Sequence, residues 1–321
     1  MTYDKIPSLD LADFTSGTAE QKKQFVQELG QAYEEIGFVA IKNHGLSDEL
    51  TAKLYDSFQS FFQLEQSKKE SYIIPGLNGQ RGYIGKGKEH AKGRKVGDLK
   101  EFYHIGQEVQ DGDAIKSDYP DNIWVSEVDD FEELTIKAFK TLEHTGKNML
   151  KAIALFLGLE ENYFEEKVHN GNSILRAIHY YPIDPETVEP DAVRAAEHGD
   201  INLITLLMGA SADGLQVLRK DGKWIPITAL PEQIIVNVGD MLERLTNNRL
   251  TSTIHRVVNP PKELLNTSRY SIPFFMHPRM SMDLSCLSEC IDENNPKKHE
   301  DIIAGDFLMQ RLKEIGLAKK S

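Results

Sequence analysis

Residues 173–182 read SILRAIHYYP, and residues 201–209 read INLITLLMG. In both stretches, short runs of apolar and β-branched residues end at turn residues, which is typical of β-strands. The same pattern recurs further along the chain in GLQVLRK, WIPITAL, QIIVNVGD, STIHRVVNP and SRYSIPFFMHP, at residues 214–220, 224–230, 233–240, 252–260 and 268–278. Many short strands at this spacing predict a sandwich or jelly roll.

Helical patterns flank these strands. A short buried strand is also expected in FVAIKNHG, residues 38–45, because Gly37 ends the helix before it. The glycine-rich residues 75–106 predict loops with short extended pieces. Apolar residues at helical spacing predict helices over residues 19–36, 48–62, about 131–157 and roughly 300–315.

The predicted fold class is therefore mainly β with flanking α-helices. We expect residues 1–125 to form an N-terminal α/β region. Residues 126–321 should hold the long helix, a strand-rich catalytic core at about 173–280 and a C-terminal helix. The two parts are expected to form one compact unit, because barrels and sandwiches of this length often fold as one domain.

Composition and charge exclude several classes of function. The net charge of −13 disfavours nucleic-acid binding, since such a surface repels phosphate backbones. No apolar run approaches the roughly 18 residues of a membrane helix, and no secretory signal is visible at the N-terminus. Two cysteines, Cys286 and Cys290, cannot form a disulfide framework for 321 residues. We expect a cytoplasmic protein; the sequence does not predict its oligomeric state.

His198 and Asp200 flank a single residue, and His255 lies in a later predicted strand. In an extended chain, side chains two residues apart point to the same face. Two histidines and one carboxylate that leave other positions open are typical of non-haem Fe(II) oxygenases, whereas four protein ligands would indicate structural zinc. An isolated His-x-Asp is also common by chance, and a hydrogen-bonded pair on a sheet is the alternative interpretation.

Arg269 and Ser271 follow His255 in the predicted strand SRYSIPFF. Strand alternation places them on one face with Pro273 and Phe275. A guanidinium offers a two-pronged donor that matches a carboxylate, and a serine hydroxyl can add a third hydrogen bond. Arg269 and Ser271 therefore form a predicted carboxylate clamp, that is, a site for an anion. The alternative is that Arg269 is a surface arginine in an ordinary ion pair.

Together these motifs resemble the isopenicillin N synthase-like branch of the 2-oxoglutarate/Fe(II)-dependent oxygenases. The matching residues are His198-Gly199-Asp200, the stretch VGDMLERLTNNRLTSTIHRVV and Arg269-Tyr270-Ser271. The N-terminal IPSLDL and GFVAIKNHG are similar to the family's N-terminal region. The resemblance therefore covers most of the chain.

This resemblance implies a double-stranded β-helix of the jelly-roll, cupin-like type. It implies Fe(II) held by His198, Asp200 and His255, with 2-oxoglutarate as co-substrate and O2 as oxidant. The activity implied is hydroxylation, desaturation or ring closure of a small molecule, with release of succinate and CO2. The co-substrate would contact Arg269 and Ser271.

Three further residues are expected to lie near the site. Many relatives carry Asn-x-Tyr where this chain has His179-Tyr180-Tyr181, so Tyr181 is expected to contact the co-substrate. Phe275, on the face of the clamp, and His179 are candidates for the substrate pocket, although His179 could equally be a packed strand histidine.

Two alternative functions remain open at this stage, together with two interpretations of a basic segment. Isopenicillin N synthase uses its Arg-x-Ser pair for the substrate's carboxylate, so a 2-oxoglutarate-independent oxidase of that type, or of the ethylene-forming type, fits the motifs. A non-catalytic metal- or ligand-binding relative fits as well. The basic run from Arg81 to Lys100, which includes Lys86 and Arg94, is either a solvated loop or a rim that attracts an acidic substrate.

Overall fold

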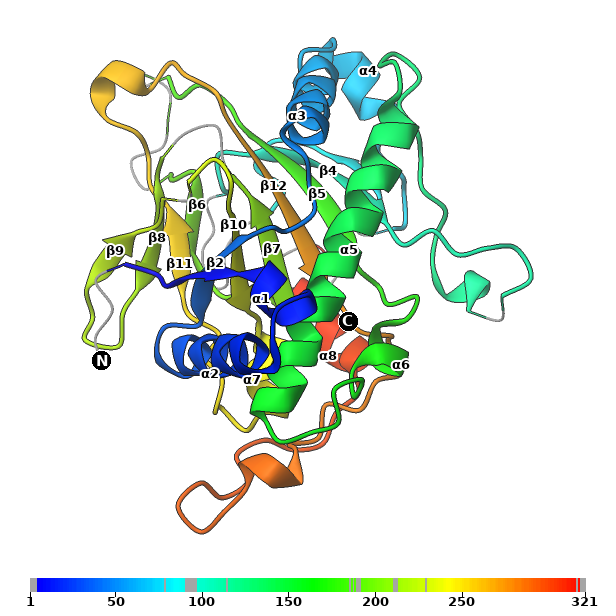
Figure 1. Ribbon diagram of the computed structural model, residues 1–321. Helices are drawn as coiled ribbons and strands as arrows, with labels where there is room; N and C mark the ends of the chain where they lie inside the picture. The colour runs from blue at the N-terminus through cyan, green and yellow to red at the C-terminus, as the bar shows by residue number, and fades with distance from the viewer. Residues whose placement is uncertain are drawn as a thin grey trace.

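The computed structural model describes residues 5–317 except 78, 90–96, 114, 185, 187, 189–191, 210–212, 229 and 316. Two β-sheets form its centre (Figure 1). In sheet order, the larger one comprises β1 (Ser8–Asp10), β2 (Phe38–Lys42), β10 (Ile234–Val238), β7 (Ile204–Met208), β12 (Arg269–Met276), β5 (Ile174–Tyr180), β4 (Glu101–Gly106) and β3 (Gly82–Ile84). The smaller one comprises β6 (Ala195–His198), β11 (His255–Val257), β8 (Leu215–Leu218) and β9 (Trp224–Pro226).

The two sheets face each other across a buried layer. Phe38 and Ile178 of the large sheet pack in one apolar cluster with Val217 and Val257 of the small sheet. The strands of each sheet pair antiparallel, except that β1 runs parallel to β2. This arrangement confirms the predicted fold class, a β core of the jelly-roll type with flanking helices.

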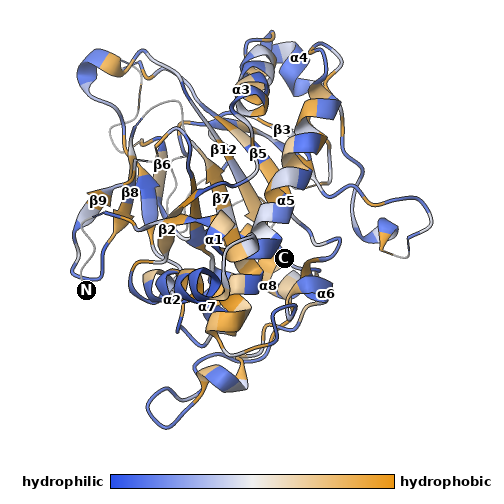
Figure 2. Ribbon diagram, viewed as in Figure 1, coloured by the Kyte–Doolittle hydropathy of each residue, from blue (hydrophilic) through white to orange (hydrophobic). Residues whose placement is uncertain are grey.

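Helices cover the outer face of the large sheet (Figure 1). The longest, α5 (Phe131–Phe156), crosses β7 and β12 and packs against α2 (Ala19–Glu35) and α3 (Asp48–Phe62). A Cβ placed on Gly30 would lie 2.0 Å from the ring of Phe156, so only glycine allows α2 and α5 to approach this closely. Figure 2 shows hydrophobic strands beneath helices that alternate between hydrophobic and hydrophilic residues. The remaining helices are α1 (Leu11–Thr15), α4 (Gln66–Glu70), α6 (Glu165–Val168), α7 (Asp240–Leu245) and α8 (Ala304–Glu314).

The predicted helices agree with the structure closely where a capping residue marks the start. Thr18 and Gln21 form a reciprocal capping box at α2, and Ser47 accepts a hydrogen bond from the backbone of Leu50 at α3. The last helix begins at Ala304, later than expected. No helix among the described residues is long and apolar enough to cross a membrane.

Two details differ from the prediction. His198 ends strand β6, which was not predicted, and β7 begins only at Ile204. In the basic run, Arg81 and Lys100 are buried and not solvated, whereas Lys92, Arg94 and Lys95 lie outside the described residues. Charge alone did not indicate this burial, because it depends on how the chain folds around each side chain: Lys100 is buried with its acidic neighbours Glu89 and Asp98.

Candidate active site

Three potential metal ligands converge where β6 meets β11. His198 lies directly opposite His255 in the register of the two strands, and their ring centroids are 4.4 Å apart. The Oδ1 atom of Asp200 lies 3.7 Å from Nε2 of His255. One donor atom from each of the three residues lies within 4.8 Å of the others, close enough to share one ion.

Backbone carbonyls set the orientation of both imidazoles. Nδ1 of His198 lies 2.7 Å from the carbonyl oxygen of Ala196, and Nδ1 of His255 lies 3.1 Å from that of Thr253. Since a carbonyl only accepts, each Nδ1 donates its hydrogen and each Nε2 keeps a lone pair for a metal. Burial, followed by the neighbouring His255, lowers the pKa of His198 to about 4, so its imidazole is neutral, the form that binds metals.

Two donors orient the carboxylate of Asp200. Its Oδ2 accepts hydrogen bonds from Oγ1 of Thr205 at 2.7 Å and from Nδ2 of Asn237 at 2.8 Å, so Oδ1 is left for an ion. Burial acts to raise the pKa of Asp200, but the nearby histidines and these hydrogen bonds together hold it below its ordinary value. The side chain therefore supplies one negative charge.

A side chain between the two ligands would crowd two polar neighbours. A Cβ on Gly199 would lie 2.8 Å from Oδ1 of Asp240 and 3.1 Å from Oγ of Ser252. The Ser252 hydroxyl donates to the same Asp240 oxygen at 2.7 Å. A larger residue at position 199 would therefore require the side chains of Asp240 and Ser252 to shift.

The donor set fits a ferrous ion. Two neutral imidazoles and one carboxylate match the two-histidine, one-carboxylate set of non-haem Fe(II) sites, which leaves positions for other ligands. A structural zinc would require a fourth protein donor, and none of the described His, Cys, Asp or Glu residues joins these three within the same distance.

Replacing Thr205 by valine tests the support of the carboxylate. The change keeps the shape of the side chain but removes one of the two donors to Asp200. We expect metal affinity to fall about 10- to 100-fold, the usual effect of losing a partner of a metal ligand. Titration of the protein with Mn(II) against a competing chelator measures the change, and an unaltered affinity would show that Asn237 alone suffices.

A small hollow joins the triad to the predicted carboxylate clamp. It has a volume of about 70 Å³. Arg269, Ser271, Pro273 and Phe275 all line it, as strand alternation predicts, together with the three candidate ligands. The Arg269 side chain is buried, and its guanidinium lies 5.0 Å from the centre of the Tyr180 ring.

The tyrosine in this hollow differs from the one predicted. Along β5 the side chains of Ile178 and Tyr180 face the hollow, whereas Tyr181 does not line it. The ring of Tyr181 instead lies beneath the ammonium of Lys86, at 4.4 Å. Tyr180 is thus the tyrosine of β5 that lines the hollow, and the expected contact between Tyr181 and the co-substrate stays a prediction.

His179 also lies away from the predicted pocket. Alternation along β5 turns it to the other face, where its Nδ1 contacts Oε1 of Glu101 at 2.7 Å. Its Nε2 lies 2.9 Å from Oγ of Ser268, and its ring stacks on Tyr270 with 4.8 Å between centroids. These contacts favour the alternative interpretation of His179 as a packed strand histidine.

A larger cavity opens on the other side of the triad. Its volume is about 250 Å³, and His198, Asp200 and Phe275 line it. The opposite wall comes from α8, through residues such as Leu308 and Leu312. Arg311 of the same helix pairs with Asp240 at the start of α7, at 2.9 Å. The sequence did not indicate this role for the last helix.

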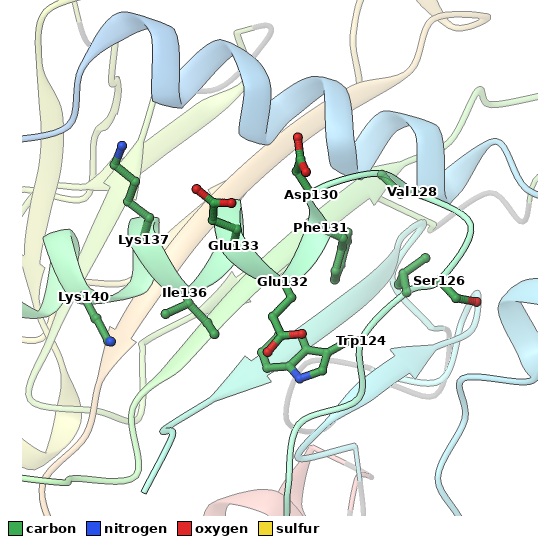
Figure 3. Close-up of a pocket in the computed structure, with 11 residues that line it drawn as sticks. Trp124, Ser126, Val128, Asp130, Phe131, Glu132, Glu133, Ile136, Lys137 and Lys140 are labelled. Atoms are coloured by element: carbon green, nitrogen blue, oxygen red, sulfur yellow. The ribbon is translucent and has the colours of Figure 1, made fainter. Parts of the chain in front are cut away.

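A further hollow lies at the start of α5, shown in Figure 3. Trp124 and Ser126 line it from the preceding loop, and Glu132, Lys137 and Lys140 line it from the helix. It is open and about 840 Å³ in volume. It shares no lining residue with either cavity beside the triad, and its acidic and basic side chains converge on no common point (Figure 3).

Comparison with known proteins agrees with this geometry. Residues 171–278 match the 2OG-Fe(II) oxygenase superfamily, and residues 6–127 match the non-haem dioxygenase N-terminal region, described from morphine synthesis. A solved 2OG-Fe(II) oxygenase family protein from Caulobacter crescentus is 40% identical, with 98% of this chain and 100% of that chain covered and a TM-score of 0.86.

Two relatives carry more specific descriptions. A Neurospora crassa protein, solved at full length in complex with alpha-KG and thymine, is 30% identical, with 96% of each chain covered and a TM-score of 0.84. The proline hydroxylase buaE of Petromyces alliaceus is 32% identical, with 96% of this chain and 98% of that protein covered. The chain therefore belongs to the 2-oxoglutarate/Fe(II)-dependent oxygenases, with Fe(II), 2-oxoglutarate and O2 as its cofactor and co-substrates.

Proposed function

We propose that His198, Asp200 and His255 bind the ferrous ion, and that Arg269 and Ser271 bind the distal carboxylate of 2-oxoglutarate. Tyr180 takes the place expected for Tyr181 beside the co-substrate. The observation that carries this proposal is that His198 and Asp200 line both cavities. One ion held there would contact the co-substrate in the small hollow and face a substrate in the larger cavity.

In this assignment each protein group has a positioning task. When bound, Fe(II) with 2-oxoglutarate and O2 supplies the oxidising chemistry, which releases succinate and CO2. The Nε2 atoms of His198 and His255 and Oδ1 of Asp200 would hold the ion at the place where the two cavities meet. The guanidinium of Arg269 neutralises a carboxylate in a buried place, where a charge-assisted bond is strong. Leu308 and Leu312 of α8 keep water away from the substrate side.

The substrate is proposed to be a small molecule. The cavity of about 250 Å³ lies just below the roughly 300–1,000 Å³ typical of pockets for drug-sized ligands. Relatives described as binding thymine or hydroxylating proline act on molecules of this size. Phe275, half-buried between the two hollows, is the proposed contact for the part of the substrate nearest the ion.

A reducing compartment, such as the cytoplasm, is part of the proposal. Cys286 and Cys290 are the only cysteines of the chain, and both are free thiols. This supports the proposed compartment, because an oxidising one would favour their pairing or modification.

The function is tested by incubating the protein with Fe(II), 2-oxoglutarate and O2 while succinate is measured. Thymine and L-proline serve as the first substrates. We expect slow succinate formation without substrate, faster formation with an accepted substrate and none when a chelator removes the iron. Absence of succinate under all conditions, despite bound Fe(II) and 2-oxoglutarate, would instead favour a non-catalytic ligand-binding protein.

A further inference from the structure

A compact cluster of charged residues forms one wall of the larger cavity. Nζ of Lys100 lies 2.7 Å from Oε1 of Glu89 and 2.9 Å from Oδ2 of Asp98. Nη1 of Arg176 lies 3.1 Å from the same Glu89 oxygen. All four residues line the cavity that His198 and Asp200 also line. Buried ion pairs of this kind are costly to desolvate and are weak evidence of a stabilising role, so a role in binding has to be considered.

The guanidinium of Arg176 is held on several sides. Its Nε donates to Nε2 of His104 at 2.6 Å, and Nδ1 of His104 donates to the carbonyl of Gly79 at 2.5 Å. Burial holds the pKa of His104 well below its ordinary value, which keeps that ring a neutral acceptor. The guanidinium lies 4.2 Å from the centre of the Phe102 ring and 5.1 Å from that of Phe275.

This fixed guanidinium retains an unused donor. Nε bonds His104 and Nη1 bonds Glu89, and no hydrogen bond joins Nη2 to any of the residues that the structure describes. Arg176 lines both the larger cavity and the small hollow, so its guanidinium is available to a ligand in this space. A donor held so rigidly binds an acceptor with little loss of side-chain entropy.

Glu89 offers the complementary acceptor. Its Oε1 receives both Lys100 and Arg176, whereas its Oε2 is buried and has no partner within the described part of the chain. Burial acts to raise the pKa of Glu89, but Arg176 and Lys100 hold it well below its ordinary value, so the side chain is a carboxylate. An ionised buried oxygen without a donor is unfavourable, and a ligand N–H that approaches it would remove this penalty.

The charges of the cluster decide the kind of ligand. Two carboxylates, Glu89 and Asp98, balance two cations, Lys100 and Arg176. A carboxylate ligand on Arg176 would lie close to both acids, and an ammonium ligand on Glu89 would lie close to both bases. Like charges would repel in both cases. A neutral group with an acceptor and a donor side by side is repelled by neither the acids nor the bases.

We propose that Glu89 and Arg176 form a substrate-recognition subsite for a neutral cyclic amide. The ligand carbonyl accepts from Nη2 of Arg176, its adjacent N–H donates to Glu89, and its ring lies against Phe275. Lactams, imides and ureides all present this pair of groups. This inference rests on the proposed function, because it assigns the substrate class of that active site.

The test measures binding to the full-length protein loaded with Mn(II) and saturated with 2-oxoglutarate, without oxygen. The probes are three cyclic amides (thymine, uracil and 2-pyrrolidinone), their fully N-methylated counterparts, and L-proline as an ammonium carboxylate. Calorimetric titration gives each Kd. We expect at least one cyclic amide to bind about 10- to 100-fold more tightly than its N-methylated form, since a hydrogen bond to a buried charge is lost. L-Proline should bind more weakly than that amide.

The Glu89→Gln variant separates hydrogen bonding from steric effects. Discrimination here is the ratio of the Kd of an N-methylated probe to the Kd of its parent amide. If the methyl groups only clash with the protein, this ratio should be the same in both proteins. If Glu89 accepts the N–H as proposed, the ratio should fall at least about fivefold in the variant. Glu101→Gln is the matched control, because Glu101 is an equally buried, ion-paired carboxylate that binds Lys69 at 2.8 Å outside the cavity. It should lower stability without changing ligand discrimination.

Each outcome is decisive. If N-methylated probes bind as well as their parents, if L-proline binds most tightly, if Glu89→Gln leaves discrimination unchanged, or if no cyclic amide binds, the subsite assignment is overturned. Failure of the parent protein to bind 2-oxoglutarate would contradict the proposed co-substrate site itself, so the two failures are distinguishable.

Discussion

Replacing Asp200 by alanine should abolish iron-dependent turnover. The variant loses the only negative charge among the three candidate ligands and leaves Thr205 and Asn237 without their acceptor. We expect metal affinity to fall by more than the roughly 100-fold that loss of a supporting residue costs, and succinate formation to fall by at least about a thousandfold. Titration with Mn(II) and a succinate assay at saturating Fe(II) measure both effects.

His144→Ala is the control for this experiment. His144 is an exposed histidine of α5 that lies near Asn148 and outside both cavities. Its replacement should leave metal affinity and turnover unchanged. An Asp200→Ala protein that binds Mn(II) as tightly as its parent would disprove the metal site and, with it, every role assigned around it.

Replacing Arg269 by leucine should separate metal binding from co-substrate binding. The guanidinium is buried beside Ser271 in the small hollow, so its loss removes the charge that is proposed to neutralise the distal carboxylate. We expect the Kd of 2-oxoglutarate to rise about 100-fold, since charge-assisted bonds to a buried carboxylate are lost. Calorimetry on the Mn(II)-loaded variant measures this, and Mn(II) affinity itself should stay within about threefold.

Arg279→Leu serves as the matched substitution, because Arg279 binds a backbone carbonyl of His169 outside both cavities. The same experiment addresses an alternative that the sequence left open. If Arg269→Leu bound 2-oxoglutarate normally but lost affinity for the primary substrate, the clamp would hold the substrate's carboxylate instead, as in isopenicillin N synthase.

The sequence was most informative where a local rule decides the structure. Thr18 and Ser47 mark helix starts because a side-chain oxygen there accepts a backbone hydrogen that no carbonyl can reach. Strand alternation is another local rule, since side chains two residues apart point to the same face, and it correctly placed Arg269, Ser271 and Phe275 together. The two-residue spacing of His198 and Asp200 indicated a shared face, although the turn after β6, and not β7, brings them together.

What the sequence could not provide depends on long-range contacts. A shift of one residue exchanges the two faces of β5, so the letters of the motif alone did not indicate that Tyr180, and not Tyr181 or His179, lines the small hollow. Glu89 lies within the basic run from Arg81 to Lys100, and no local pattern assigns it to the site. Its contacts with Lys100 and Arg176 depend on pairing between β4 and β5, which no local pattern in the sequence reveals.

The position of α8 has a consequence for biosynthesis. Every strand of both sheets precedes this helix in the chain, yet its Leu308 and Leu312 complete the wall opposite the triad. During translation the two sheets can assemble while the ribosome still holds α8, which leaves the ligand side chains open to solvent. In the proposed assignment, the substrate cavity is complete only after Arg311 pairs with Asp240. A chain that ends before Ala304 is therefore expected to bind metal as the full-length chain does but to release the substrate faster.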